Sequence, residues 1–304
     1  MKQAEGGNAA TGRNGNGKEW QTFVGIELVM AGIFGGSVLA GIVGALAGLG
    51  GGVLIVPLLT IGFGVDIRYA IGASVISVIA TSSGAAAAYV RDRITNLRIG
   101  MFLELATTTG AICGAFLATL FAPAGLSILF GLVLAISVLP LIAKLGEELP
   151  AGVVNDSWAR RLRLSGQYYD AVLGRVVSYQ VKRVPLGVAM MWLAGLISGL
   201  LGIGSGTFKV LAMDTAMRLP MKVSTTTSNF MIGVTAAASA GIYFSRGYVH
   251  PLIAAPVALG VLAGAWLGSR LLVRLHNTTL RKLFVPIMLV IAVQMVLKGV
   301  GVQL

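Results

Sequence analysis

The chain has 304 residues, of which 56% are hydrophobic and only 11% are charged. Polar surface is too scarce to cover a soluble globule of this size, so the composition indicates a membrane protein. The formal net charge of +12 could suggest a nucleic-acid partner. We expect none, because basic residues such as Arg91, Arg93 and Arg98 lie between apolar segments, where the positive-inside rule places them on cytoplasmic loops.

The residues that usually carry metal binding or catalysis are scarce. Cys113 is the single cysteine and lies in an apolar run, so no disulfide framework exists, and His250 and His276 are the only histidines. This excludes a cluster of histidine and cysteine ligands, and we expect neither a metal nor a cofactor. The sequence also lacks a phosphate-binding loop and a nucleophile elbow. We therefore do not expect an enzyme.

Apolar segments recur along the whole chain. The first follows a weakly basic tail and is too long for the apolar region of a typical signal peptide, so we treat it as part of the fold. Eight segments approach the length of about 20 residues that crosses a bilayer: 25–47, 70–90, 99–121, 126–143, 186–202, 223–244, 251–273 and 281–298. Two shorter apolar pieces, 53–62 and 207–217, each follow a glycine cluster. At half a crossing each, they are typical of broken or re-entrant helices.

A charged stretch divides the chain near its middle. We predict a tail over 1–24, a first transmembrane repeat over 25–145, a basic cytoplasmic linker over 146–183 and a second repeat over 184–304. Within the linker, Trp158, Leu162 and Leu164 stand beside arginines. They could form an amphipathic helix at the membrane surface, or the stretch could be a solvated loop.

The two halves align without a gap at an offset of 154 residues, which indicates an internal duplication. Six glycines of the first half fall on glycines of the second: Gly41, Gly48, Gly50, Gly52, Gly110 and Gly114 on Gly195, Gly202, Gly204, Gly206, Gly264 and Gly268. In the same frame Ser74 falls on Ser228, Thr81 on Thr235 and Tyr89 on Tyr243.

Loop charges predict that the copies are inverted. In the first half the basic loop is 91–98, whereas in the second half the basic excess moves to 274–282. Under the positive-inside rule both loops are cytoplasmic, so the copies lie upside down relative to each other. Inversion requires an odd number of crossings in each copy, and we infer that the first segment and its short partner form a re-entrant hairpin. The predicted fold class is thus an all-α membrane protein of two inverted repeats with glycine-broken half-helices.

The glycine clusters are the strongest local signal for a binding site. Gly50, Gly51 and Gly52 precede the first short segment, and the range 204–206, Gly204-Ser205-Gly206, precedes the second. Glycine breaks an apolar helix, and the free N–H groups at the start of the next helix can bind an anion without a buried cation. Close packing of helices through small residues is the alternative. The symmetric recurrence favours binding.

Lys209 follows three residues after Gly206. A lysine centred in a membrane helix costs roughly 2.5–3.5 kcal/mol, so it should face a cavity, an anion or a carboxylate. Reaching to the membrane surface, or pairing with Asp214, is the alternative. We favour a cation that faces a cavity.

Further polar side chains lie in the segments that follow the short helices. Ser74, Ser228 and Asn229 are candidates for contacts with a substrate. Asn229 is the strongest of them, because its amide has both donors and acceptors to satisfy. The alternative for the serines is structural: a hydroxyl in a membrane helix commonly bonds to a carbonyl of its own helix. Weaker candidates are Ser77, Thr81, Ser82 and Ser83. Glu104 could take part in proton coupling, but we favour a pair with Arg98 or a position at the membrane surface.

The motif Gly48-Leu49-Gly50-Gly51-Gly52-Val53-Leu54-Ile55-Val56-Pro57, repeated from Gly202 to Val210, resembles the paired glycine signature of the TauE/SafE family of sulfite and organosulfonate exporters. The run from Ser228 to Ser239 is also similar to that family's second repeat. Leu211 stands where the family often has proline, and Ser205 replaces a usual glycine. The resemblance covers residues 25–145 and 185–300. It implies a duplicated helical transporter of sulfur-containing anions in the cytoplasmic membrane.

The expected function is therefore a secondary transporter, and more narrowly an exporter, of a small anion such as sulfite or an organosulfonate. The main alternative is an anion channel, because the same donors could line a continuous pore. A carrier for sulfate or a carboxylate is another. The expected partners are the small anionic substrate and the lipid bilayer; a homodimer is compatible with the sequence, which leaves the oligomeric state open.

Overall fold

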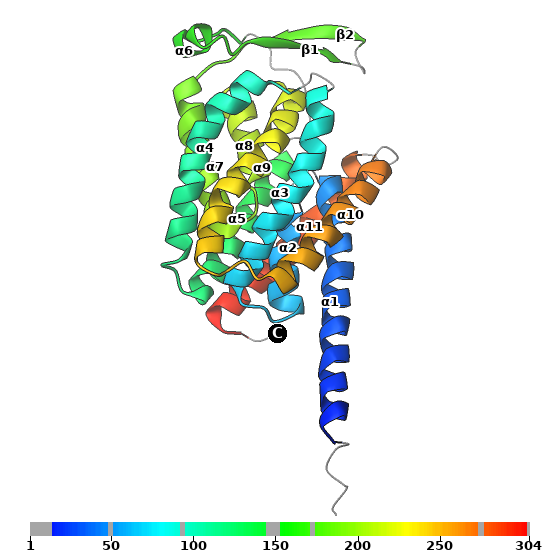
Figure 1. The fold of residues 1–304 in the computed structure, drawn as a ribbon. Coiled ribbons are helices and arrows are strands. Elements are labelled where there is room, and N and C mark those ends of the chain that lie inside the picture. Colours follow the sequence, from blue (N-terminus) through cyan, green and yellow to red (C-terminus); the bar gives the residue numbers. More distant parts are fainter. Residues whose placement is uncertain are drawn as a thin grey trace, which may run out of the picture.

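A computed structural model describes residues 14–47, 51–91, 95–143, 153–170, 174–272 and 277–302. This part of the chain is mostly helical (Figure 1). Its long helices are α1 (Asn14–Ala47), α3 (Ile67–Arg91), α4 (Leu97–Ala118), α5 (Pro123–Ala143), α7 (Val184–Leu201), α9 (Met221–Ser245), α10 (Pro251–Leu272) and α11 (Asn277–Val300). Its short helices are α2 (Gly52–Pro57) and α8 (Gly206–Leu211), which continue into the π-helical turns η1 (Leu58–Gly62) and η2 (Ala212–Ala216).

Each long helix falls on one of the eight apolar segments predicted from hydropathy, and the short helices fall on the two shorter pieces. Four long helices contain stretches apolar enough to cross a membrane by length and composition: Glu27–Gly44, Leu97–Ala118, Val184–Leu201 and Pro251–Gly268. Their outer faces expose large apolar side chains such as Leu105, Phe116 and Leu259. Because such a surface is costly in water and favourable in lipid, the prediction of membrane helices is confirmed.

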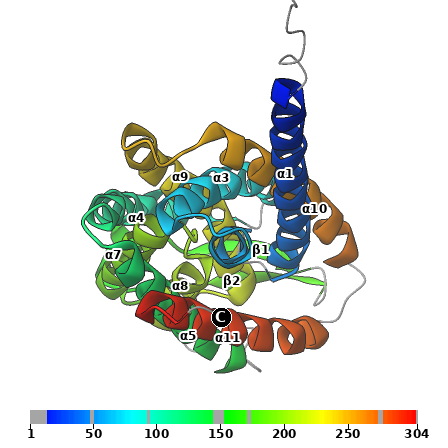
Figure 2. The same cartoon turned by 90° about the horizontal axis from the view of Figure 1, so that it is seen from below.

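The long helices pack in pairs. α1 lies along α10, and α4 lies along α7; α3 and α9 lie side by side between these two pairs, and α5 packs on α11 (Figures 1 and 2). Because the first two pairs, like the central pair, join helices from opposite halves of the chain, the halves form a single bundle.

Glycine allows the flanking pairs to pack backbone to backbone. A Cβ atom on Gly41 of α1 would lie 2.5 Å from the carbonyl oxygen of Val261 in α10. At the equivalent place in the other pair, a Cβ atom on Gly195 of α7 would lie 2.1 Å from the carbonyl oxygen of Thr107 in α4. No side chain fits at these separations, so these glycines serve close helix packing.

Each short helix runs back along the long helix that precedes it. Gly36 of α1 faces Leu58, and Gly32, one turn earlier, faces Phe63, so η1 is antiparallel to α1. In the second half, the N–H of Lys182 donates to the carbonyl of Met217 at 3.2 Å, which joins the residues just before α7 to those just after η2. The break after the long helix therefore makes a helical hairpin in both halves.

The linker contains strands, so the expectation of an all-α chain was wrong here. A short helix α6 (Ser157–Arg161) is followed by the antiparallel strands β1 (Gly166–Asp170) and β2 (Arg175–Tyr179), which lie at one end of the bundle in Figure 1. Aromatic and β-branched residues such as Tyr168 and Val177 face each other across the strands and favour a hairpin.

The β-hairpin is fastened to the loop between α3 and α4. Asn96 donates from Nδ2 to the hydroxyl of Tyr179 at 2.7 Å and to the carbonyl of Leu164 at 3.3 Å, while its Oδ1 caps α4 by accepting from Ile99 N–H. Burial raises the pKa of Tyr179, and the hydrogen bond from Asn96 opposes that rise. Around Trp158, where either an amphipathic surface helix or a solvated loop was expected, the structure has only the five helical residues of α6, and Leu164 is fully buried.

Candidate functional site

The break between α7 and α8 is a run of left-handed backbone. Gly202, Gly204 and Ser205 have φ of 65°, 70° and 43°, which glycine adopts freely and serine does not. Gly202 ends α7 by donating its N–H to the carbonyl of Ser198. Of the matching first-half cluster, Gly50 lies outside the described residues, and Gly51 and Gly52 begin α2. Glycine at 202 and 204 thus lets the chain reverse after α7 inside an apolar bundle.

The two breaks meet inside the bundle. Ser74 Oγ on α3 lies 3.1 Å from the carbonyl oxygen of Gly52 and 2.7 Å from that of Gly202, so one hydroxyl contacts both breaks. A Cβ atom on Gly52 would lie 3.0 Å from the same Gly202 oxygen. In the second half, Ser228 Oγ on α9 donates to the carbonyl of Gly206 at 3.2 Å. Both serines therefore hold the half-helix starts in place through carbonyl groups.

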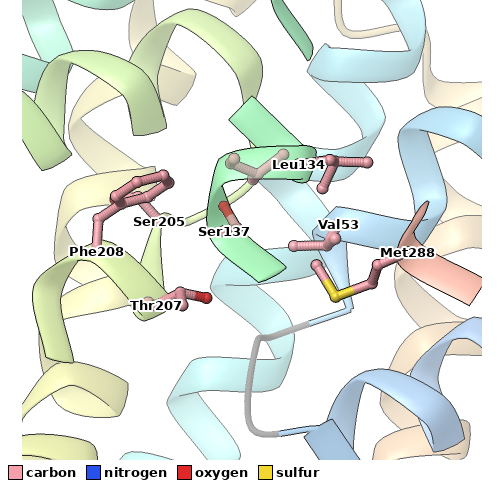
Figure 3. Close-up of a pocket in the computed structure, with 9 residues that line it drawn as sticks. Val53, Leu134, Ser137, Ser205, Thr207, Phe208 and Met288 are labelled. Carbon is pink, nitrogen blue, oxygen red and sulfur yellow. The ribbon is translucent and has the colours of Figure 1, made fainter. Parts of the chain in front are cut away.

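A small pocket opens beside this junction (Figure 3). It is lined by Val53, Leu134, Ser137, Ile203, Ser205, Gly206, Thr207, Phe208 and Met288. Thr207 and Phe208 lie on one side of it, and Val53 and Met288 on the other. The lining thus comes from both half-helices, α5 and α11, and includes the predicted site residues Ser205 and Gly206.

The pocket is supplied with hydrogen-bond donors. The first hydrogen bond within α8 runs from Lys209 N–H to Ser205 O, and helix geometry then leaves the N–H groups of Gly206, Thr207 and Phe208 without partners inside the helix. Ser205 Oγ is buried and has no partner among the described residues. A buried hydroxyl without a partner is uncommon and indicates a missing ligand or water. These donors suit a small anion.

Lys209 does not line this pocket. Its side chain is fully buried, and its Nζ donates to Thr235 Oγ1 on α9. Thr235 Oγ1 in turn lies 2.7 Å from Glu104 Oε1 on α4, which also accepts from Thr108 Oγ1 at 3.1 Å. The charge that faces the buried Lys209 ammonium, through Thr235, is therefore the carboxylate of Glu104 and not that of Asp214.

The expectation that Glu104 pairs with Arg98 or reaches the surface was wrong. Glu104 is 7% exposed, and Arg98 donates instead to the carbonyl of Arg163 in the linker. Arg98 lies near the start of α4 and Glu104 six residues further along. The guanidinium is turned away from Glu104, toward the linker end of the bundle. Sequence reasoning missed the link from Glu104 through Thr235 to Lys209, because these three residues lie on α4, α9 and α8, far apart in the chain. The available signal was a second ionisable residue in another apolar helix.

The remaining candidates lie around the junction. Asn229 is half-buried, and among the described residues its amide has no hydrogen-bond partner. The weaker candidates of α3 donate to carbonyls of their own helix, which favours a structural role for them: Ser77, Thr81, Ser82 and Ser83. Of the ten predicted site residues, the structure thus brings the glycine breaks, Ser74, Ser205 and Ser228 together, and directs Lys209 to a neighbouring cluster.

A bundle of apolar helices in which two broken helices meet beside a pocket is the architecture of a membrane transporter. The chain belongs to the sulfite exporter TauE/SafE family, whose profile matches residues 33–295. It is therefore a multi-pass membrane protein and a transporter, not an enzyme.

Two curated relatives come from Bacillus subtilis (strain 168). The chain is 28% identical to the "Probable membrane transporter protein YunE" over 273 residues, which cover 86% of this chain and 95% of the relative. It is 28% identical to the "Probable membrane transporter protein YdhB" over 234 residues, which cover 76% of this chain and 86% of that relative. No solved structure matches the chain significantly.

Proposed function

We propose that this protein is a secondary transporter, and specifically an exporter, of small sulfur-containing anions such as sulfite or organosulfonates across the cytoplasmic membrane. The observation that carries the proposal is the meeting of the two half-helix starts at a pocket with unpaired donors. The family's description as sulfite exporters supports the choice of anion. The names of the two relatives state transport without a substrate.

The second part of the proposal is that the chain consists of two inverted copies. Its elements repeat at an offset of 154 residues: α2 and α8 begin at Gly52 and Gly206, and α3 and α9 at Ile67 and Met221. The equivalent helices α3 and α9 are antiparallel. Gly72 near the start of α3 faces the Tyr248 carbonyl just after α9. At the other end, the N–H of Asn96, just after α3, donates to Thr227 Oγ1 near the start of α9.

This arrangement supports a specific path through the membrane. α1 with α2 and η1, and α7 with α8 and η2, would be re-entrant hairpins, which leaves three crossings in each copy. The basic linker over 146–183 would be cytoplasmic. Alternating access would then be a rocking of one copy against the other about the junction of the half-helices.

At the site, the substrate oxygens would accept hydrogen bonds from the N–H groups of Gly206, Thr207 and Phe208 and from Ser205 Oγ. The positive end of the α8 helix dipole would add to the attraction. Gly51 and Gly52 would offer the matching start of α2, with Ser74 and Ser228 fixing both starts. Asn229 remains a candidate for a contact during the transport cycle, and Lys209 would supply positive charge one helical turn from Ser205.

The test is transport by purified protein in proteoliposomes, offered sulfite, sulfate, methanesulfonate and acetate in turn. We expect saturable uptake of the sulfur oxyanions. Flux that far exceeds carrier turnover would show a channel instead, and preference for acetate would reject the substrate class.

Ser205→Gly is the sharpest variant, because glycine suits the left-handed backbone while the hydroxyl is lost. It should be at least as stable as the parent protein and should bind the anion roughly five- to tenfold more weakly. Ser245→Ala is the matched control, since Ser245 is exposed and bonds only to Ile242 O in its own helix. Equal affinity in both variants would remove Ser205 from the site.

A further inference from the structure

Three polar side chains form a buried chain between the halves, apart from the pocket. Lys209 of α8, Thr235 of α9 and Glu104 of α4 are 0%, 0% and 7% exposed. The ammonium donates to the Thr235 hydroxyl, and that hydroxyl lies 2.7 Å from Glu104 Oε1. The two charges also interact electrostatically. Ionisable groups inside a membrane bundle are costly and usually mark an ion pathway.

The Thr235 hydroxyl has two acceptors within reach and one proton to give. It lies 2.7 Å from Glu104 Oε1 and 2.9 Å from the Met231 carbonyl of its own helix. A hydroxyl donates one hydrogen bond and accepts two. If Glu104 is ionised, Thr235 donates to it. If Glu104 is protonated, the carboxyl group donates to Thr235, whose own proton turns to Met231 O. Both protonation states fit without movement of a heavy atom.

Glu104 also has an unused oxygen. Its Oε2 is buried and has no hydrogen-bond partner among the described residues. An ionised carboxylate would leave that charged oxygen unsatisfied, whereas a carboxylic acid can leave one oxygen bare at a lower cost. The bare Oε2 thus favours the protonated carboxyl group, whereas the nearby Lys209 ammonium favours the ionised one.

Among the described residues, few other charges face this carboxyl group. α7, which packs along α4, carries no titratable side chain, and α9 contributes Thr235 at this level, with Lys222 and Arg246 near its ends. η2 contributes Asp214, which makes interactions of its own. On α4 itself, Arg98 bonds to the linker and Cys113 is exposed. Lys209 is thus the cation that responds to the charge of Glu104.

The equivalent place in the first half shows that the fold does not need these charges. At the offset of 154 residues, Lys209 corresponds to Ile55, Thr235 to Thr81 and Glu104 to Ala258. Ile55 is fully buried, and Thr81 bonds only to carbonyls of its own helix. An apolar arrangement therefore packs there, and two buried opposite charges are seldom more stable than such an arrangement. Their presence in one half alone indicates a function.

We propose that Glu104, Thr235 and Lys209 form a proton-binding site that couples proton movement to anion transport. The coupling rests on the proposed function; the proton site itself does not. Water supplies the proton, which binds Glu104 and leaves the charge of Lys209 uncompensated. Lys209 lies one helical turn from Ser205, whose carbonyl accepts the Lys209 N–H, so an anion at the pocket is then bound more tightly. By linkage, a bound anion favours uptake of the proton to the same degree.

The proton site is tested without any substrate. Infrared spectra of the purified protein in nanodiscs, recorded from acid to alkaline buffer, should contain a carboxylic-acid band that is lost in Glu104→Gln. The band should persist in Glu27→Gln, which removes an exposed carboxyl group of α1. Identical titration in all three proteins would overturn the proposal. If Glu104→Gln fails to fold, the same infrared titration is recorded on the double variant Glu104→Gln with Lys209→Met, which has no charge at this place, like the first half.

Coupling is tested by proton uptake when methanesulfonate, which does not titrate in this range, is added to weakly buffered protein. The parent protein and Glu27→Gln should take up protons and bind the anion about tenfold more tightly in acid than in alkaline buffer. The double variant should show neither effect. Anion binding without proton uptake in the parent protein, or uptake retained in the double variant, would refute the coupling. A parent protein that binds no anion would reject the proposed function and leave the infrared result to decide on the proton site.

Discussion

Ser74 Oγ lies 2.7 Å from the carbonyl oxygen of Gly202, a residue 128 positions further along the chain. The same hydroxyl contacts Gly52 O, so a single side chain joins both helix breaks at the centre of the bundle. The bond links α3 of the first half to the end of α7 in the second. It is one of the few polar contacts by which the buried junction is fixed.

Replacement of Ser74 by alanine should be more harmful than the same change at Ser228. Ser74→Ala removes a hydroxyl whose single proton is shared between two buried carbonyls, those of Gly52 and Gly202, whereas Ser228→Ala affects only Gly206 O. We expect the free energy of unfolding to fall by about 1–3 kcal/mol for Ser74→Ala and by about 1 kcal/mol for Ser228→Ala. Thermal denaturation in detergent would measure both, and equal losses would contradict the central role of Ser74.

Removing only one of the two buried charges, Lys209 and Glu104, should destabilise the protein. Lys209→Met strands the Glu104 carboxylate, at a cost of roughly 3–5 kcal/mol. Adding Glu104→Gln should restore most of the stability, because neither charge then remains. Adding Asp214→Asn instead should restore little. Thermal stability of the three proteins decides the matter, and rescue by Asp214→Asn would show that Lys209 pairs with Asp214.

The glycine contacts between α4 and α7 predict a strong positional contrast. Gly195→Ala would place a Cβ atom 2.1 Å from Thr107 O and should force the helices apart, with a large loss of folded protein. Gly35→Ala is the control, since a Cβ atom there has nothing within 4 Å and alanine favours a helix by about 1 kcal/mol over glycine. The yield of monodisperse protein after size-exclusion chromatography would show the difference.

The inverted arrangement predicts that the loops 91–98 and 274–282 share the cytoplasmic side. A single cysteine in either loop, in a Cys113→Ala background, should resist an impermeant thiol reagent applied outside intact cells and react once the cells are opened. If one loop is labelled from outside and the other is not, the two copies are not inverted.

The buried phenol of Tyr179 predicts an alkaline weakening of the linker. Burial raises the pKa of Tyr179 above 10.0, so the folded state favours the neutral phenol. That stabilisation is complete below pH 10.0 and is lost as the pH rises through the folded-state pKa. Tyr179→Phe should lower stability at neutral pH by about 1 kcal/mol, through loss of the Asn96 hydrogen bond, and should flatten the alkaline fall. Proteolysis of the linker as a function of pH would follow the effect, and a parallel fall in both proteins would exclude Tyr179 as its source.

The helices were predictable because lipid imposes a simple requirement on them. Apolar segments such as 99–121 and 251–273 predict α4 and α10, and the glycine clusters predict the helix breaks before Gly52 and Gly206. The β-hairpin was missed because its five-residue strands are short and stand among charges, where Tyr168-Tyr169 and Val176-Val177 were the available signal. Local composition describes segments well when one solvent dominates their environment.

The polar contacts of the site were not predictable in the same way. Thr235 and Glu104 are 131 residues apart in the chain, and the sequence around either residue does not indicate that the other is its hydrogen-bond partner. Ser205 was recognised as part of a glycine cluster, but its unpaired hydroxyl depends on the positive φ of its backbone and on the side chains that close around it. Such pairings are decided by how helices from the two halves meet.

The confinement of Lys209 and Glu104 to one half has a consequence for the resting protein. If two inverted copies exchange conformations, a two-fold rotation about an axis in the membrane plane relates the inward-open form to the outward-open form. With identical copies the two forms would be equally populated. Here Ile55 and Ala258 occupy the counterpart positions, so the exchange places the charges in different surroundings in the two forms. The empty carrier should therefore rest facing one side of the membrane, giving its cycle a preferred starting point.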